Sequence, residues 1–241
     1  MNKLVLCEGK TDAILLSYYL EKTCGWTHRN APESLNIKVD EIRGESAFWY
    51  RKENDSLLIC GVGGKNRFGS FFREKILPTM VHSNAFSKIA VSIDRDNQDE
   101  QSVIDSFCSS FRPIINNIRC DIWVSNTYEN SYKQQAFVEF LLVIVPADKE
   151  GALETLLLEA ISENAYDKAI VSCSIAYVDQ IQPIASNYLH KKRLKLKACL
   201  GVTWAIQYPE KLFSFVDEQI RSVKWESSQV LAQCFHQLKN I

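Results

Sequence analysis

The residues most able to do chemistry are two pairs of carboxylates, each placed where an apolar run ends. Glu8 directly follows the apolar run 3–7, and Asp12 lies at the start of the segment 11–24, whose apolar residues recur at helical spacing. This pattern predicts a strand, a turn and a helix. Because ligands of open α/β proteins collect beyond the carboxyl ends of the strands, both carboxylates are expected to face a binding edge.

The second pair, Asp94 and Asp96, stands where the apolar run 88–93 gives way to an acidic turn. In an extended chain, residues two apart project to the same side, so these two carboxylates could share one cation while Arg95 points away. A helix is expected to follow over residues 100–111.

Four carboxylates brought together raise one another's pKa unless a cation neutralises them. Hard divalent ions such as Mg²⁺ and Mn²⁺ prefer such all-oxygen surroundings, so the cluster implies a bound metal. Taken singly, Asp12 could be a carboxylate favoured by the start of a helix, and the segment 94–97 could be a solvated loop. The occurrence of both pairs at strand-to-helix junctions favours a metal site.

These acidic pairs belong to a chain of ordinary globular composition. It has 241 residues, 46% of them hydrophobic and 24% charged, and a formal net charge of -1, which excludes a uniformly basic nucleic-acid-binding protein but not a local basic stretch. The eight cysteines show no C-x-x-C pair, which indicates buried thiols in a reducing compartment. No apolar stretch approaches the ~18 residues of a membrane span, so a cytoplasmic protein is predicted.

The first 150 residues are predicted to form an α/β core. A second strand–turn–helix unit has its strand at 57–62 and its helix at 68–81, which Pro78 is expected to end or kink. Repeated units of this kind favour a mostly parallel, Rossmann-like sheet flanked by helices. The runs 119–124 and 137–145, around a polar centre, suggest a hairpin.

From Gly151 onward the pattern becomes helical. No Gly/Ser-rich linker precedes this part, so residues 151–241 are predicted to be a helical extension packed on the same domain. The helical segments are expected at 153–161, 169–189, 194–206 and 216–238.

The segments LVLCEGKTDAILL, GVGGK and SIDRD, in this order, resemble the Toprim domain shared by topoisomerases, bacterial primases and the overcoming-lysogenization-defect (OLD) nucleases. The resemblance covers about the first 145 residues. It implies that Glu8, Asp12, Asp94 and Asp96 bind catalytic metal, with Glu8 also taking part in catalysis.

The later part of the chain resembles the OLD branch, in which a G-x-L-E segment and a lysine on a following helix complete a two-metal site. The resemblance implies that Glu154 is a further metal ligand, although it could also be a surface helix residue. A lysine near Lys195 is implied to be catalytic, while a solvated helix face is the alternative for each lysine. The lysines that fit are Lys191, Lys192, Lys195 and Lys197.

The turn that contains Gly63, Gly64 and Lys65 resembles the glycine-containing turn after the second strand of that family. Glycines there would let backbone N–H groups approach a phosphate, and Lys65 would contact a nucleic-acid backbone. A tight strand-to-helix turn also requires glycine, so the motif alone has two interpretations.

Together these features predict a divalent-metal-dependent nuclease that cleaves DNA or RNA by a two-metal mechanism, and the resemblance suggests an anti-phage defence effector. The chain has no P-loop, so a separate ATPase is the expected partner; whether it forms a homo-oligomer stays open. One alternative is a non-catalytic Toprim-like module that regulates a partner ATPase. Another is a phosphatase that uses D-x-D, but such enzymes place that motif after the first strand, where this chain has Glu8.

Overall fold

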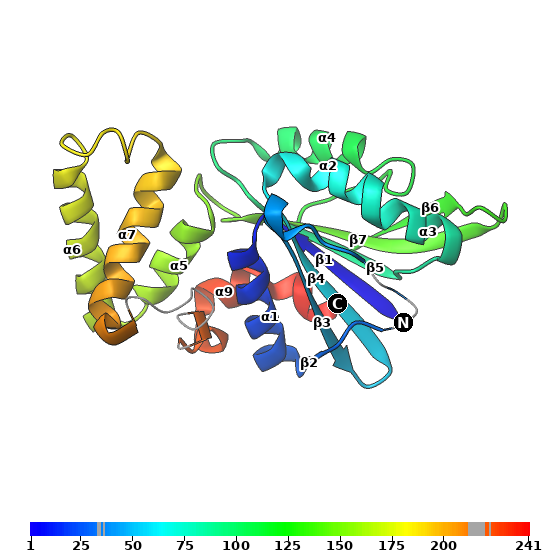
Figure 1. The fold of residues 1–241 in the computed structure, drawn as a ribbon, viewed down its shortest axis with the longest axis horizontal. Coiled ribbons are helices and arrows are strands. Elements are labelled where there is room, and N and C mark those ends of the chain that lie inside the picture. Colours follow the sequence, from blue (N-terminus) through cyan, green and yellow to red (C-terminus); the bar gives the residue numbers. More distant parts are fainter. Residues whose placement is uncertain (33–34, 36, 212–219, 222) are drawn as a thin grey trace.

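Four parallel strands form the centre of a seven-stranded sheet in the computed structural model, which describes residues 1–241 except 33–34, 36, 212–219 and 222 (Figure 1). The strand order is β2-β3-β4-β1-β5-β7-β6, and β4, β1, β5 and β7 are parallel neighbours. The central strands are β1 (Asn2–Cys7), β4 (Asp55–Val62), β5 (Lys88–Asp94) and β7 (Gln135–Val145). Antiparallel strands complete both edges: β2 (Thr27–Arg29), β3 (Glu45–Lys52) and β6 (Val124–Glu129). The predicted mostly parallel α/β fold is thus confirmed.

The central strands are apolar on both faces because helices cover both sides of a parallel sheet. In β1, Leu4 and Leu6 belong to one buried apolar cluster, and Val5 and Cys7 belong to the other. Helices on the Leu4 side are α2 (Phe68–Phe71), α3 (Leu77–Ser83) and α4 (Glu100–Ser110). Helices on the Val5 side include α1 (Lys10–Cys24) and α9 (Gln229–Cys234), and Figure 1 shows the two layers.

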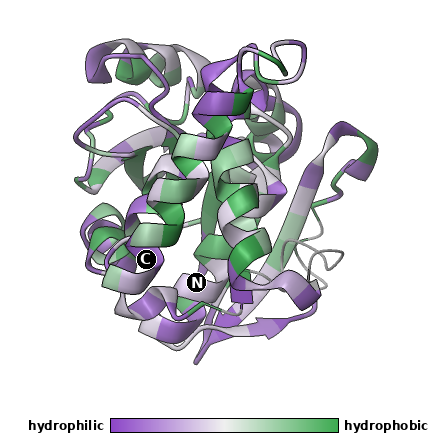
Figure 2. Cartoon of the chain, turned by 90° about the vertical axis from the view of Figure 1, so that its left-hand side faces the viewer, coloured by the Kyte–Doolittle hydropathy of each residue, from purple (hydrophilic) through white to green (hydrophobic). Residues whose placement is uncertain are grey.

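Three further helices lie beyond one end of the sheet, on the left of Figure 1: α5 (Leu153–Ile161), α6 (Ala165–Ile181) and α7 (Lys192–Gln207). Their buried residues join the apolar cluster that also contains α1. Figure 2, which views the molecule from this side, shows polar and apolar residues mixed along the helices, as expected when only one face is buried. No helix among the described residues is long and apolar enough to cross a bilayer.

The hairpin after α4 differs from its predicted strands. A strand was expected at 119–124, but β6 begins at Val124, and the preceding segment contributes only an isolated bridge between Cys120 and Leu142. Asp121 adopts a positive φ of 56°, which interrupts an extended chain. The hairpin itself forms, with Glu129 opposite Gln135 at its tip.

At three other places the observed elements differ from the predicted ones or add detail to them. No strand was predicted at residues 27–29 and 45–52, where the edge strand β2 and its neighbour β3 lie. Pro78 does not end the helical run, which continues to Ser83 through a π-helical turn at Phe72–Ile76. Conversely, the helix that was expected to reach residue 189 is shorter. Helix α6 ends at Ile181, which lies two residues before Pro183. The predicted helix 216–238 falls partly outside the described residues, and its described part contains short helices separated by turns.

A buried carboxylate joins the edge of the sheet to the turn after β4. Glu45, the first residue of β3, is 3% exposed, and its Oε1 lies 2.9 Å from Arg67 Nη2. Its Oε2 lies 2.6 Å from Lys75 Nζ and accepts a hydrogen bond from the backbone N–H of Asp40. These contacts hold the 3-10 turn Lys65–Arg67, and so fix the backbone that carries Lys65.

Glu45→Gln is expected to lower the free energy of unfolding by about 3–5 kcal/mol, because it leaves two cations without their buried partner. Urea denaturation followed by tryptophan fluorescence measures this loss. Glu129→Gln is the matched control, since Glu129 forms an exposed pair with Lys133 and should cost under about 1 kcal/mol. Equal effects of the two substitutions would show that the Glu45 contacts do not hold the turn.

Candidate metal and phosphate site

Glu8 and Asp94 form the buried centre of the site. Each follows or ends one of the adjacent parallel strands β1 and β5, and each is 1% exposed. The backbone N–H of Asp94 donates to Glu8 Oε1 at 3.1 Å, and the N–H of Leu153, the first residue of α5, donates to Asp94 Oδ1 at 2.9 Å. Two strand ends and one helix start therefore bring these carboxylates together at the carboxyl edge of the sheet.

Asp12 adds a third carboxylate from the first turn of α1. It accepts a hydrogen bond of 3.2 Å from the N–H of Gly9, the residue before the helix. Burial, and then the charge of Glu8, raise the pKa of Asp12 to about 7. Burial, followed by the charges of Asp12 and Glu8, raises the pKa of Asp94 to about 8, and burial also raises the pKa of Glu8. The three groups thus oppose one another's ionisation, as crowded carboxylates do.

Glu154 approaches the same cluster from the second residue of α5. Its charge contributes to the raised pKa of Asp12. Its Oε2 is buried and has no hydrogen-bond partner among the described residues, while its Oε1 lies 3.9 Å from Lys197 Nζ. The structure therefore brings together Glu8, Asp12, Asp94 and Glu154 from four separate elements.

Asp96 does not project with Asp94 as expected. Its φ of 56° breaks the extended chain, because its backbone pairs with Gly151 through hydrogen bonds of 2.7 and 2.9 Å. Its Oδ2 lies 2.8 Å from Lys65 Nζ, which also donates to the carbonyl of Asp94 at 2.8 Å. The expectation that both aspartates share one side is wrong, and Asp96 stands beside the cluster as the partner of Lys65. Arg95 turns away and donates to the carbonyl of Pro146.

A cation that the sequence analysis missed lies at the centre. Arg193, the second residue of α7, places Nη1 3.3 Å from Glu8 Oε2 and Nη2 3.1 Å from Asp94 Oδ2. A guanidinium is a planar fork that can face two carboxylates at once, which a lysine cannot do. The sequence signal was the basic run 190–197, in which only the lysines were considered.

The lysines of that run have other neighbours. The Lys195 ammonium lies 2.5 Å from Asp179 of α6, and Lys192 pairs with Glu150 at 3.0 Å. Lys191 is the residue before α7, and Lys197 lies nearest to Glu154. The structure thus does not bring Lys195 to the carboxylates and instead assigns the central cation to Arg193, because the start of α7 presents a different residue to the cluster.

The glycines of the turn after β4 are required by the backbone conformation and its hydrogen bonds. Gly63 has a φ of +84°, and a Cβ there would lie 2.3 Å from the carbonyl oxygen of Arg43, so only glycine fits. The N–H of Gly64 donates to the backbone carbonyl of Glu8 at 2.7 Å. That donor is engaged, which leaves Lys65 as the residue of this turn that presents a charge to the acidic cluster.

The oxygen donors of the cluster fit a hard divalent cation. Among the described residues no three His, Cys, Asp or Glu side chains are already arranged around a metal position, and the guanidinium of Arg193 lies against two of the carboxylates. Two buried oxygens, Asp94 Oδ2 and Glu154 Oε2, nevertheless have no hydrogen-bond donor. The charged neighbour of Asp94 Oδ2 is Arg193, at an ion-pair distance of 3.1 Å. Buried carboxylate oxygens without donors are suited to Mg²⁺ or Mn²⁺.

Metal-free protein is expected to lose stability as the pH rises from about 4 to about 8. Asp94 and Asp12 have folded-state pKa values above their unfolded values, so the folded chain binds more protons across this window, and stability falls with pH. In EDTA, Asp94→Asn should therefore gain stability relative to wild type as the pH rises. Urea denaturation midpoints at several pH values measure this gain. Asp99→Asn, at an exposed position, should show no such gain. If the midpoints of wild type and Asp94→Asn change with pH in parallel, the carboxylates do not raise one another's pKa as described.

Comparison with known proteins places the chain in a family. A crystal structure of hypothetical protein PH0156 from Pyrococcus horikoshii OT3 is similar, with 19% sequence identity, a TM-score of 0.49, and coverage of 98% of this chain and 99% of that one. The search of curated proteins found no match. The model of the family described as "Protein of unknown function (DUF3226)" matches residues 2–238. The chain therefore belongs to the DUF3226 family.

Proposed function

We propose that this protein is a divalent-metal-dependent nuclease that cleaves phosphodiester bonds of DNA or RNA. The observation that carries the proposal is the convergence of two buried carboxylates, at the ends of β1 and β5, with two half-buried ones from α1 and α5, beside the cationic side chains Arg193 and Lys65. The order of these acidic residues also resembles that of Toprim nucleases. Crowded carboxylates with raised pKa values are typical of functional centres, since folding alone gains nothing from their repulsion.

Glu8, Asp12, Asp94 and Glu154 are the residues that would hold Mg²⁺ or Mn²⁺. Bound there, the ions would supply Lewis-acid polarisation of the phosphate and a water of lowered pKa, which is the chemistry of two-metal nucleases. Asp96 pairs with Lys65 through Oδ2. Backbone N–H donors from Gly9, Asp94 and Leu153 help to position Asp12, Glu8 and Asp94 respectively.

Arg193 and Lys65 provide the positive charge that a phosphate requires. The Arg193 guanidinium lies 3.3 Å from Glu8 Oε2 and 3.1 Å from Asp94 Oδ2, and its fork could instead hold two phosphate oxygens, because carboxylate and phosphate have the same paired-oxygen geometry. Arg193 is 40% exposed, so it can be reached from solvent. Its role in the proposal is to neutralise the charge that grows on the phosphate during cleavage.

The non-catalytic alternative has one specific observation in its favour. Arg193 already neutralises Glu8 and Asp94, so these residues could be an internal ion-pair network of a binding module that regulates a partner ATPase. Such a network would need no metal. Thermal unfolding of wild type with and without Mn²⁺ discriminates the two functions, because only a metal site is stabilised by preferential binding of the ion to the folded state.

Glu8→Gln is expected to abolish most cleavage and most of the Mn²⁺-dependent rise in Tm. Loss of residues that merely support metal ligands costs about 10–100-fold in activity, so loss of a ligand should cost at least the upper end of that range. The assay is nicking of plasmid, and cleavage of single-stranded DNA and tRNA, in Mn²⁺, Mg²⁺ and EDTA. Asp99→Asn is the control, since Asp99 caps α4 through the N–H of Ser102 and Asn caps equally well.

Arg193→Ala is expected to slow cleavage strongly while leaving Mn²⁺ binding intact, because the guanidinium competes with the metal for Glu8 and Asp94 and supplies no ligand of its own. Lys195→Ala, which breaks only an ion pair with Asp179, should change the rate little. Cleavage rate and calorimetric Mn²⁺ affinity, measured for both variants, separate the roles. A slower Lys195→Ala than Arg193→Ala would return the catalytic role to Lys195.

A further inference from the structure

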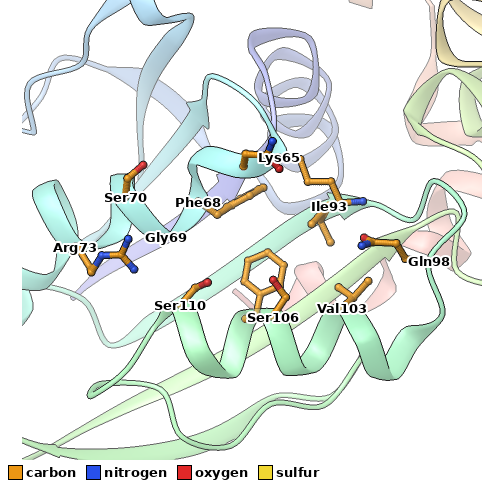
Figure 3. Close-up of a pocket in the computed structure, with 12 residues that line it drawn as sticks. Lys65, Phe68, Gly69, Ser70, Arg73, Ile93, Gln98, Val103, Ser106 and Ser110 are labelled. Carbon is orange, nitrogen blue, oxygen red and sulfur yellow. The ribbon is translucent and has the colours of Figure 1, made fainter. Parts of the chain in front are cut away.

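A pocket of about 360 Å³ opens between α2 and α4 and is lined in part by Lys65 (Figure 3). Its floor is apolar and contains the buried side chains of Ile93, Val103 and Phe107. Its walls are polar. The remaining lining residues are Lys65, Asn66, Phe68, Gly69, Ser70, Arg73, Gln98, Ser106 and Ser110.

The charged side chains that line this pocket are both positive. Lys65 and Arg73 are its charged lining residues, and no aspartate or glutamate is among the described residues that line it. Arg73 makes no ion pair or hydrogen bond with any described part of the chain, in contrast to Arg67 and Lys75 close by, which both bind Glu45. An arginine left without an acidic partner beside a pocket is suited to bind an anion.

Hydroxyl groups face the arginine across the pocket. Ser106 and Ser110 are four residues apart on α4, so they project from the same face of the helix. Figure 3 shows both pointing into the gap toward the side of α2. Neither hydroxyl has a hydrogen-bond partner in the described part of the chain, whereas the neighbouring Ser109 hydroxyl donates to the carbonyl of Ser106. Two free hydroxyls and a guanidinium form a donor set for a phosphate.

Gly69 keeps the two walls close and the pocket open. A Cβ at this position would lie 3.2 Å from Arg73 Nη1, 3.2 Å from Ser110 Cβ and 3.3 Å from Ser110 Oγ. Its backbone is ordinary helix, so no unusual φ requires glycine here. Glycine at this position therefore leaves room in the pocket, where the unpaired Arg73 and the free hydroxyl of Ser110 come together.

Lys65 connects this pocket with the acidic centre. It lines the pocket, and its Nζ also lies 2.8 Å from both Asp96 Oδ2 and the carbonyl oxygen of Asp94. A chain of phosphates that reached the carboxylates could therefore pass Lys65 and continue into the gap between α2 and α4. The gap is bounded by helices on both sides, which suits a single strand better than a duplex.

We propose that the pocket between α2 and α4 binds a phosphate group of a nucleic-acid single strand, next to the phosphodiester held at the carboxylates, through Arg73, Ser106 and Ser110. This inference rests on the proposed nuclease function and assigns the path of its substrate. The apolar floor contributes contact area for the sugar or base, while the charge comes from Arg73 and Lys65.

Binding of a fluorescent oligothymidylate, measured by anisotropy in Ca²⁺ over a series of salt concentrations, tests the pocket. Arg73→Gln should weaken binding about tenfold and reduce the slope of log affinity against log salt by about 0.7, the amount for one lost phosphate contact on a single strand. Arg29→Gln is the matched control, because Arg29 is an exposed arginine on the edge strand β2 and does not line this pocket. Equal weakening by both variants would overturn the proposal.

A second pair of variants tests the other wall without removing a cation. Ser106→Glu introduces a negative charge into the pocket and should weaken binding at least as much as Arg73→Gln. Ser109→Glu places the same charge on the same helix but outside the pocket lining, and should have a smaller effect. Both serines are exposed, so the fold should tolerate each change. Indistinguishable binding by these two variants would exclude the wall of α4 as the contact surface.

Two further outcomes separate this inference from the proposed nuclease function. If wild type binds the oligonucleotide through Arg73 and Ser106 but never cleaves in Mn²⁺, the pocket stands and the nuclease function fails. If wild type cleaves and Arg73→Gln binds and cleaves equally well, the nuclease function stands and the pocket assignment fails. Competition by thymidine monophosphate or inorganic phosphate at concentrations as low as those of the oligonucleotide would identify a small-phosphate site and overturn the strand path.

Discussion

The fork of Arg193 between Glu8 and Asp94 is the interaction on which the arrangement of the molecule's chemistry depends. Two carboxylates on adjacent strand ends, both almost fully buried, carry a large desolvation penalty, which backbone N–H donors and the opposite charge of Arg193 offset in part. Arg193 supplies that charge from α7, a helix distant in sequence from both strands. The helical part of the chain is thus tied electrostatically to the sheet as well as by apolar packing.

The acidic groups of the site gather at one edge of the sheet because parallel strands end together. Glu8 leaves β1, Asp94 ends β5 and the glycine turn follows β4, the other neighbour of β1. Helix starts then add Asp12 and Glu154, whose carboxylates are favoured by the positive end of the helix dipole. The local environment of each residue is ordinary, and it is their convergence that creates crowding, raised pKa values and unpaired oxygens.

The α/β class and the meeting of Glu8, Asp12 and Asp94 could be predicted from the sequence, because adjacent parallel strands place their next residues at one edge. Asp96 could not be placed, since its positive φ is imposed by pairing with Gly151, a contact that no local pattern reveals. Arg193 was hidden for a similar reason: which residue of a basic run faces a cluster depends on how α7 is rotated against α5. Strand β2 was not predictable because it is a three-residue edge strand whose residues are all exposed. Strand β3 lies inside the sheet between β2 and β4, and its apolar run 47–50 was a signal that could have found it.

The backbone bridge between Asp96 and Gly151 also bears on how the chain can be divided. Residue 150 is a natural boundary by composition, yet the next three residues provide the pairing partner of Asp96 and the N–H that holds Asp94. A shortened protein that stopped at this boundary would keep all seven strands but lose the groups that orient its two most characteristic aspartates. Residues 1–150 therefore contain the whole sheet but not the whole site. A truncated or grafted version of the site must include α5 together with the sheet.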